Sequence, residues 1–206
     1  MKEIRVVFYK PKIDRHVTDN AIAIWTAIVN IPYILKMAGW NLKRAWELLK
    51  ASNYSHVEIW EADSDGDFTA RDFFDPNGTY IYGTCSTSTM RGNSKGTVTR
   101  FADTVIHNLK RWAFATYYLT NEGYKHASTY RDTEVKNNKG YGFRDLGKFF
   151  GLRFLADPKR NICSEFVNNY LWCAYIVCKP GVIDPRRLAL IILGQGKEII
   201  GLEKVQ

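Results

Sequence analysis

Short stretches rich in β-branched and aromatic residues recur along the chain and predict β-strands. The clearest covers residues 55–61, in which apolar and polar positions alternate. On such a strand His56, Glu58 and Trp60 share one face. We predict the other strands over Ile4–Tyr9, Tyr80–Thr87, Thr97–Phe101 and Arg111–Leu119.

Other stretches repeat their apolar residues at helical spacing. One is Ala21–Val29, and we expect Pro32 to interrupt it because proline removes a helical hydrogen bond. A final helix follows Asp184 and Pro185 and closes at Gly194. We predict the helices over Leu42–Lys50, Asn121–Val135, Phe143–Phe150, Ile162–Val177 and Arg186–Leu193. A central antiparallel sheet with helices packed beside it defines an α+β fold.

The chain of 206 residues is the length of one domain, and we treat residues 1–206 as a single unit. No apolar run approaches the roughly 20 residues that span a bilayer, and the N-terminus has no signal-peptide pattern. We therefore expect no transmembrane segment and synthesis in the cytoplasm. The net charge of +8 fits a solvated basic surface or a polyanionic partner. Nucleic acid is the least favoured partner, because no nucleic-acid recognition motif is evident.

The four cysteines of the chain are Cys85, Cys163, Cys173 and Cys178. They form no Cys-x-x-Cys pair, and no cysteine and histidine cluster has the spacing of zinc ligands. We therefore expect no metal and no cofactor. Four cysteines in a chain of this length do not make a disulfide framework, so reduced thiols are the simpler expectation.

Cys163 and His56 are the candidate reactive residues. Asn161 is a good N-cap residue, which places Cys163 in the first turn of a helix. The unpaired N–H groups and the dipole of a helix start favour a thiolate, as a nucleophilic cysteine requires. His56 lies on a predicted strand, which would hold it rigidly as a general base. Each residue considered alone is more often structural than catalytic. His16, His107 and His126 fall in polar segments and are expected at the surface.

Taken together, the two segments resemble the permuted NlpC-type papain-like hydrolases, the YiiX-like group, and most closely a bacterial and phage branch. In that group a strand with Ser-His-Val precedes a helix that begins Cys-Ser-Glu. This chain has both motifs in that order, over residues 55–59 and 163–165. The resemblance extends from Ile4 to Leu193. The other counterparts of the family pattern are Cys85–Ser88, Arg91-Gly92, Lys110–Trp112, Tyr141–Phe143 and Pro185–Leu188.

The resemblance implies a circularly permuted papain-like fold with insertions at 30–52 and 62–78. It implies that Cys163 is the nucleophile and His56 the base. The family usually has the residue that orients the histidine on the next strand, where this chain offers Ser86, Thr87 or Ser88. We assign Ser86 and Ser88 to this role. Glu58 is expected to be a groove wall instead, since positions i and i+2 of a strand lie about 6.5 Å apart.

The expected substrate groove is lined by Tyr54, Glu58, Trp60 and Glu165. The resemblance implies a thiol hydrolase that cleaves an amide or ester bond. Its substrate would be a peptidoglycan peptide, another peptide or a lipid acyl group. The alternative is a catalytically weak or inactive module of the same fold, which would serve as a structural or cargo component of a phage virion and bind virion proteins.

Overall fold

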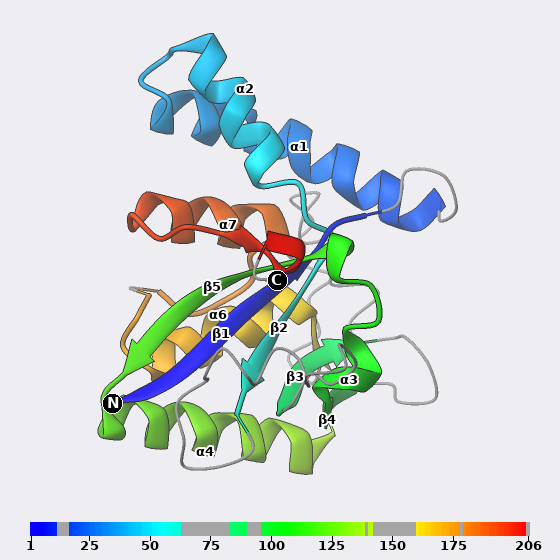
Figure 1. Ribbon diagram of the computed structural model, residues 1–206, viewed down its shortest axis with the longest axis vertical. Coiled ribbons are helices and arrows are strands. Elements are labelled where there is room, and N and C mark those ends of the chain that lie inside the picture. The colour runs from blue at the N-terminus through cyan, green and yellow to red at the C-terminus, as the bar shows by residue number, and fades with distance from the viewer. Residues whose placement is uncertain are drawn as a thin grey trace.

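A computed structural model of the chain has a six-stranded antiparallel sheet with helices beside it (Figure 1). It describes residues 1–11, 17–62, 83–89, 96–138, 140–141, 160–177 and 179–204. The strand order is β4-β3-β2-β1-β5-β8. The strands are β1 (Lys2–Tyr9), β2 (His56–Glu61), β3 (Thr84–Thr89), β4 (Gly96–Phe101), β5 (Trp112–Leu119) and β8 (Ile200–Gly201).

The described helices are α1 (Val17–Met37), α2 (Leu42–Ala51), α3 (Ala102–Val105), α4 (Asn121–Asn137), α6 (Cys163–Cys173) and α7 (Pro185–Gly194). The chain also has two short 3-10 turns, η2 (Leu109–Arg111) and η4 (Leu202–Lys204). Strands β6 (Gly140–Tyr141) and β7 (Arg160–Asn161) form a separate two-stranded parallel ladder. The predicted α+β class is therefore confirmed.

Each face of the sheet supports its own apolar core. On one face Val57 and Ile59 of β2 pack with Phe166 and Leu171 of α6 and with side chains of α4 and α7. On the other face Trp60 packs with side chains of β1, β3, β5, α3 and η4. Alternate residues of β2 therefore face different cores, as the sequence pattern predicts.

The first helix continues where we expected a break. Helix α1 runs through Pro32 to Met37. The prediction of an interruption was wrong because Pro32 lies on the exposed side of the helix, where water can hydrate the carbonyl that loses its partner. The predicted proline-led helix is confirmed as α7, and the Asp184 side chain accepts a hydrogen bond from the Arg187 N–H.

The start and end of α6 also differ from the prediction. The N-cap residue is Ile162 rather than Asn161, which belongs to β7. The helix ends at Cys173, because Ala174 caps it and Tyr175 has a positive φ of 62°. Cys163 is therefore the first residue of the helix, one position earlier than Asn161 capping would place it.

Some predictions concern residues outside the described ranges. These are His16, most of the 62–78 insertion, Arg91-Gly92, the helix over Phe143–Phe150, and Cys178. Within the described residues no helix is both long and apolar enough to cross a membrane.

Candidate active site

His56 begins strand β2 and is joined to another side chain of the same strand. Its Nε2 lies 2.9 Å from Oε1 of Glu58. Both residues face away from the core that contains Val57, because positions i and i+2 of a strand share a face. Since Glu58 occupies Nε2, Nδ1 is the ring nitrogen left for the Cys163 thiol.

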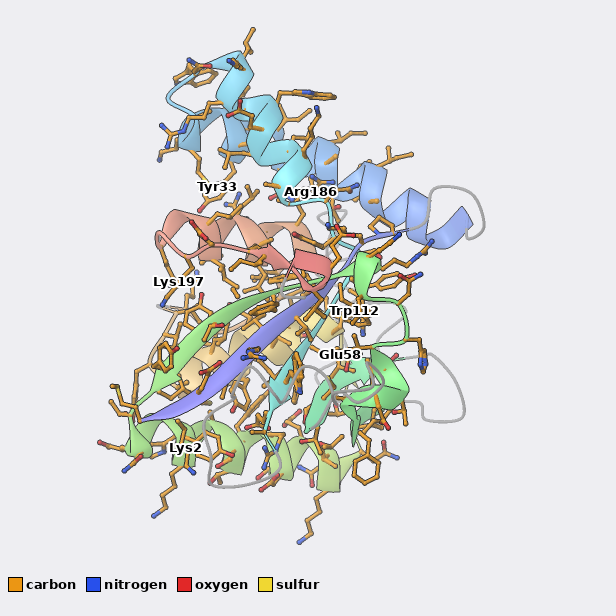
Figure 2. The ribbon with its side chains drawn as sticks, viewed as in Figure 1. Lys2, Tyr33, Glu58, Trp112, Arg186 and Lys197 are labelled. Atoms are coloured by element: carbon orange, nitrogen blue, oxygen red, sulfur yellow. The ribbon has the colours of Figure 1, made fainter. Side chains whose placement is uncertain are left out.

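Glu58 is thus the residue that orients the imidazole, which corrects the expectation that it would only line a groove. Positions i and i+2 of a strand lie about 6.5 Å apart along the backbone, but these two side chains lean toward each other and close that gap. A second contact holds the carboxylate, because Nη2 of Arg100 on β4 donates to the same Oε1 at 3.0 Å. Figure 2 shows Glu58 within the body of the molecule, close to β2 and β3.

Cys163 lies where β2 and β3 separate. The two strands pair only from Ile59 to Glu61, so Val57 lies outside their backbone ladder. The Thr87 hydroxyl donates to the Val57 carbonyl at 2.9 Å, and the Val57 N–H donates to the Cys163 sulfur. The Ser164 N–H donates to the same sulfur. Two backbone donors therefore point at the position of a thiolate.

The cysteine and the histidine shift each other's pKa. Burial raises the pKa of Cys163, but the charge and hydrogen bond of His56 and the two backbone donors outweigh it, so that the pKa is lowered. Burial lowers the pKa of His56, but Cys163 and then Glu58 outweigh it and raise the pKa to about 9. Both shifts favour a thiolate–imidazolium pair at neutral pH.

The charges of the site balance. Thiolate, imidazolium, carboxylate and guanidinium alternate in sign along Cys163, His56, Glu58 and Arg100 and sum to zero. This balance matters because Cys163 is 4% exposed, His56 7% and Glu58 1%. An isolated charge would be strongly disfavoured at such burial, whereas an alternating chain is compensated at every step.

Helix α6 and strand β2 are also connected at the end away from His56. The Tyr170 hydroxyl of α6 donates to Oε1 of Glu61 at 2.7 Å. Arg131 of α4 pairs with the other oxygen of Glu61. Tyr170 and Glu61 are both buried. This contact fixes the helix that carries the cysteine against the strand that carries the histidine.

The two serines assigned to orient His56 lie on the face of the sheet opposite Glu58. Ser86 is in register with Ile59, so it lies on the face opposite Glu58, and its hydroxyl bonds Thr99 at 2.9 Å. Ser88 is in register with Thr97 of β4 and shares the face of Ser86. The structure therefore does not place either serine where it would orient His56 through Nε2.

The residues expected to line a groove occupy different surroundings. The Tyr54 ring packs at 4.9 Å from the Phe8 ring in the core, and burial raises its pKa to about 12. Trp60 is fully buried in the second core. Glu165 lies in the first turn of α6. The remaining histidines that the structure describes, His107 and His126, are exposed, as predicted.

Two parts of the site were missed from the sequence. Arg100 carries no local signal, because only the sheet brings β4 within reach of Glu58. The Val57 N–H becomes available only where β2 and β3 part. Among the described residues no group of three or more His, Cys, Asp or Glu side chains is placed to hold a metal ion.

Comparison of the chain with protein-family models, with curated proteins and with solved structures found no match.

Proposed function

We propose that this chain is a thiol hydrolase that cleaves an amide or ester bond, with Cys163 as nucleophile and His56 as general base and acid. The observation that carries the proposal is the arrangement of three groups: a cysteine at a helix start, a histidine in hydrogen bond with it, and a carboxylate on the other imidazole nitrogen. Nucleophile, base and orienting group in this order define an activated cysteine.

The proposed reaction has two halves. The Cys163 thiolate attacks the carbonyl carbon, and the His56 imidazolium protonates the leaving amine or alcohol as the tetrahedral intermediate collapses to a thioester. Water then attacks the thioester carbonyl while neutral His56 takes one of its protons. Collapse of the second intermediate releases the acid and restores the thiolate–imidazolium pair. Glu58 keeps the imidazole in one orientation throughout and stabilises its charge.

The sequence resemblance supports the same conclusion and extends it. The histidine strand precedes the cysteine helix, as in the permuted NlpC-type group, and we propose the permuted papain-like fold on this basis. The substrates that we propose from this group are a peptidoglycan peptide, another peptide or a lipid acyl group. The carboxylate on the histidine's own strand is a departure from the usual family pattern.

The burial of Cys163 and His56 favours a second candidate function. Cys163 and His56 are 4% and 7% exposed, which leaves a substrate little direct access in this conformation. A module of this fold that has kept the residues but not the turnover, such as a structural or cargo component of a phage virion, would fit that observation. Its partners would bind elsewhere on its surface and would be insensitive to changes at Cys163.

An activated ester separates the two candidates. The hydrolase should release more than one equivalent of p-nitrophenol from p-nitrophenyl acetate and carry an acetyl group on Cys163, located by peptide mass spectrometry. Cys163→Ala should abolish both, and Cys173→Ala, which removes a partly exposed cysteine outside the site, should change neither. A chain that acquires no acetyl group on Cys163 would contradict the hydrolase and favour the binding module.

A further inference from the structure

Helices α1 and α2 form a hairpin that projects at one end of the molecule, beyond α7 (Figure 1). Its inner side packs through Ile34, Ala38 and Ala45 against Leu190 of α7. The buried Arg186 of α7 anchors it further by donating to the carbonyl oxygens of Leu49 and Ala23. The hairpin is thus a fixed part of the fold, and its outer side is available for contact.

The outer side of the hairpin is unusually apolar. Of thirteen exposed large hydrophobic side chains among the described residues, seven lie between residues 24 and 46. Trp40 at the turn is 73% exposed and Trp46 on α2 is 57% exposed. Such concentration in one short segment marks an interaction surface rather than scattered surface residues. We call this surface the hairpin face and define it by Ile24, Ile28, Ile31, Trp40, Leu42 and Trp46.

A cavity of about 540 Å³ opens between the two helices. Ile24 and Ala27 of α1 and Trp46 and Leu49 of α2 contribute to its lining, and Lys50 stands among them. The Lys50 ammonium lies 5.0 Å from the centre of the Trp46 ring. Apolar and cationic groups are therefore interleaved at the same place.

The charge around the hairpin face is almost entirely positive. Four exposed bases, Lys36, Lys43, Arg44 and Lys50, accompany a single exposed acid, Glu47, between residues 24 and 51. On α2, Lys43 and Lys50 flank Trp46 at i−3 and i+4, which places them on its side of the helix. Two copies of this face would repel each other, whereas an anionic surface would attract it.

We propose that the hairpin face docks on an anionic lipid bilayer. Tryptophans prefer the boundary between lipid head groups and acyl chains, and the isoleucine stripe of α1 would enter the apolar layer beside them. The four bases would meet lipid phosphates at the level of the head groups. Attachment of this kind lies along the surface, and no membrane-spanning helix is present among the described residues. The proposal does not depend on the hydrolase activity.

Flotation of the full chain with lipid vesicles tests this inference. The chain should float with vesicles of phosphatidylcholine and phosphatidylglycerol, and much less with phosphatidylcholine alone. The double variant Lys43→Glu and Arg44→Glu should weaken binding to the anionic vesicles about tenfold or more. Trp40→Ser with Ile28→Ser should also reduce it, without loss of folding by circular dichroism, since both side chains are exposed.

Matched controls lie away from the hairpin. Trp172→Ser removes a half-exposed tryptophan of α6, and Lys110→Glu reverses an exposed charge before β5. Neither variant should alter flotation. Cys163→Ala should float like the unmodified chain, so failure of the lipid-binding inference can be told apart from failure of the hydrolase proposal. Absence of flotation, or flotation unchanged by both hairpin variants, would overturn the inference. So would self-association in light scattering that Ile28→Ser abolishes, because the face would then bind a second copy.

Discussion

Nε2 of His56 and Oε1 of Glu58 lie 2.9 Å apart, although the two residues belong to the same strand. Base and orienting carboxylate are therefore positioned by a single element, β2, which β1 holds along its whole length and β3 holds from Ile59 to Glu61. Arg100 then fixes the carboxylate from β4. The imidazole is restrained by the sheet itself rather than by a loop, which suits a group that must face one thiol.

Replacement of Glu58 tests its role in orienting the imidazole. Glu58→Ala should lower the rate of Cys163 acetylation by about 100-fold or more, because both the orientation and the charge partner of His56 are lost. Glu58→Gln keeps an acceptor of similar size but removes the charge. Its acetylation rate should therefore lie between the rates of Glu58→Ala and of the unmodified chain. Glu122→Gln, at an exposed carboxylate of α4, serves as control and should match the unmodified chain. Equal rates in all four proteins would remove Glu58 from the site.

The sequence predicted the strand of His56, the position of Cys163 in the first turn of a helix, and the side of β2 that faces each core. Each depends on local pattern, which periodicity reports directly. The prediction that Glu58 lines a groove was wrong because spacing along a strand describes backbone positions and not where side chains meet. Arg100 could not be found, since its contact with Glu58 depends on which strands are neighbours. The predicted break at Pro32 was wrong because the solvent exposure of a proline, which local pattern does not report, decides whether a helix tolerates it.

The pKa of His56 should depend on Cys163. Its value of about 9 arises mainly from the thiolate, with Glu58 adding to it, while burial acts in the opposite direction. Cys163→Ala should therefore lower the pKa of His56, which NMR titration of the imidazole can measure. Cys173→Ala removes a thiol outside the site and should leave the titration in place. A His56 pKa that is the same with and without the Cys163 thiol would show that the two groups do not interact.

Tyr170 should contribute to stability through Glu61. Tyr170→Phe removes the hydroxyl that donates to Oε1 and leaves that buried oxygen without this donor. We expect the free energy of unfolding in urea to fall by about 1–2 kcal/mol. The same change at exposed Tyr118 should have almost no effect. If both variants unfold alike, the contact does not hold α6 to β2.

The ultraviolet absorbance of the Cys163 thiolate, taken as the difference between the unmodified chain and Cys163→Ala across pH, tests the central claim most directly. It needs neither a substrate nor access to the buried sulfur. The thiolate should form with a pKa below the ordinary value of 9.0, because His56 and two backbone donors favour it. As the pH rises toward about 9, His56 loses its proton and the charge pair is lost, although the thiolate remains.

His56→Ala should move the thiolate transition to higher pH, because burial then acts against the charge without the imidazolium to offset it. A thiolate pKa below 9.0 in the unmodified chain, together with a higher pKa in His56→Ala, would establish the activated cysteine. A transition at or above 9.0 in the unmodified chain, or one that His56→Ala does not move, would contradict the account.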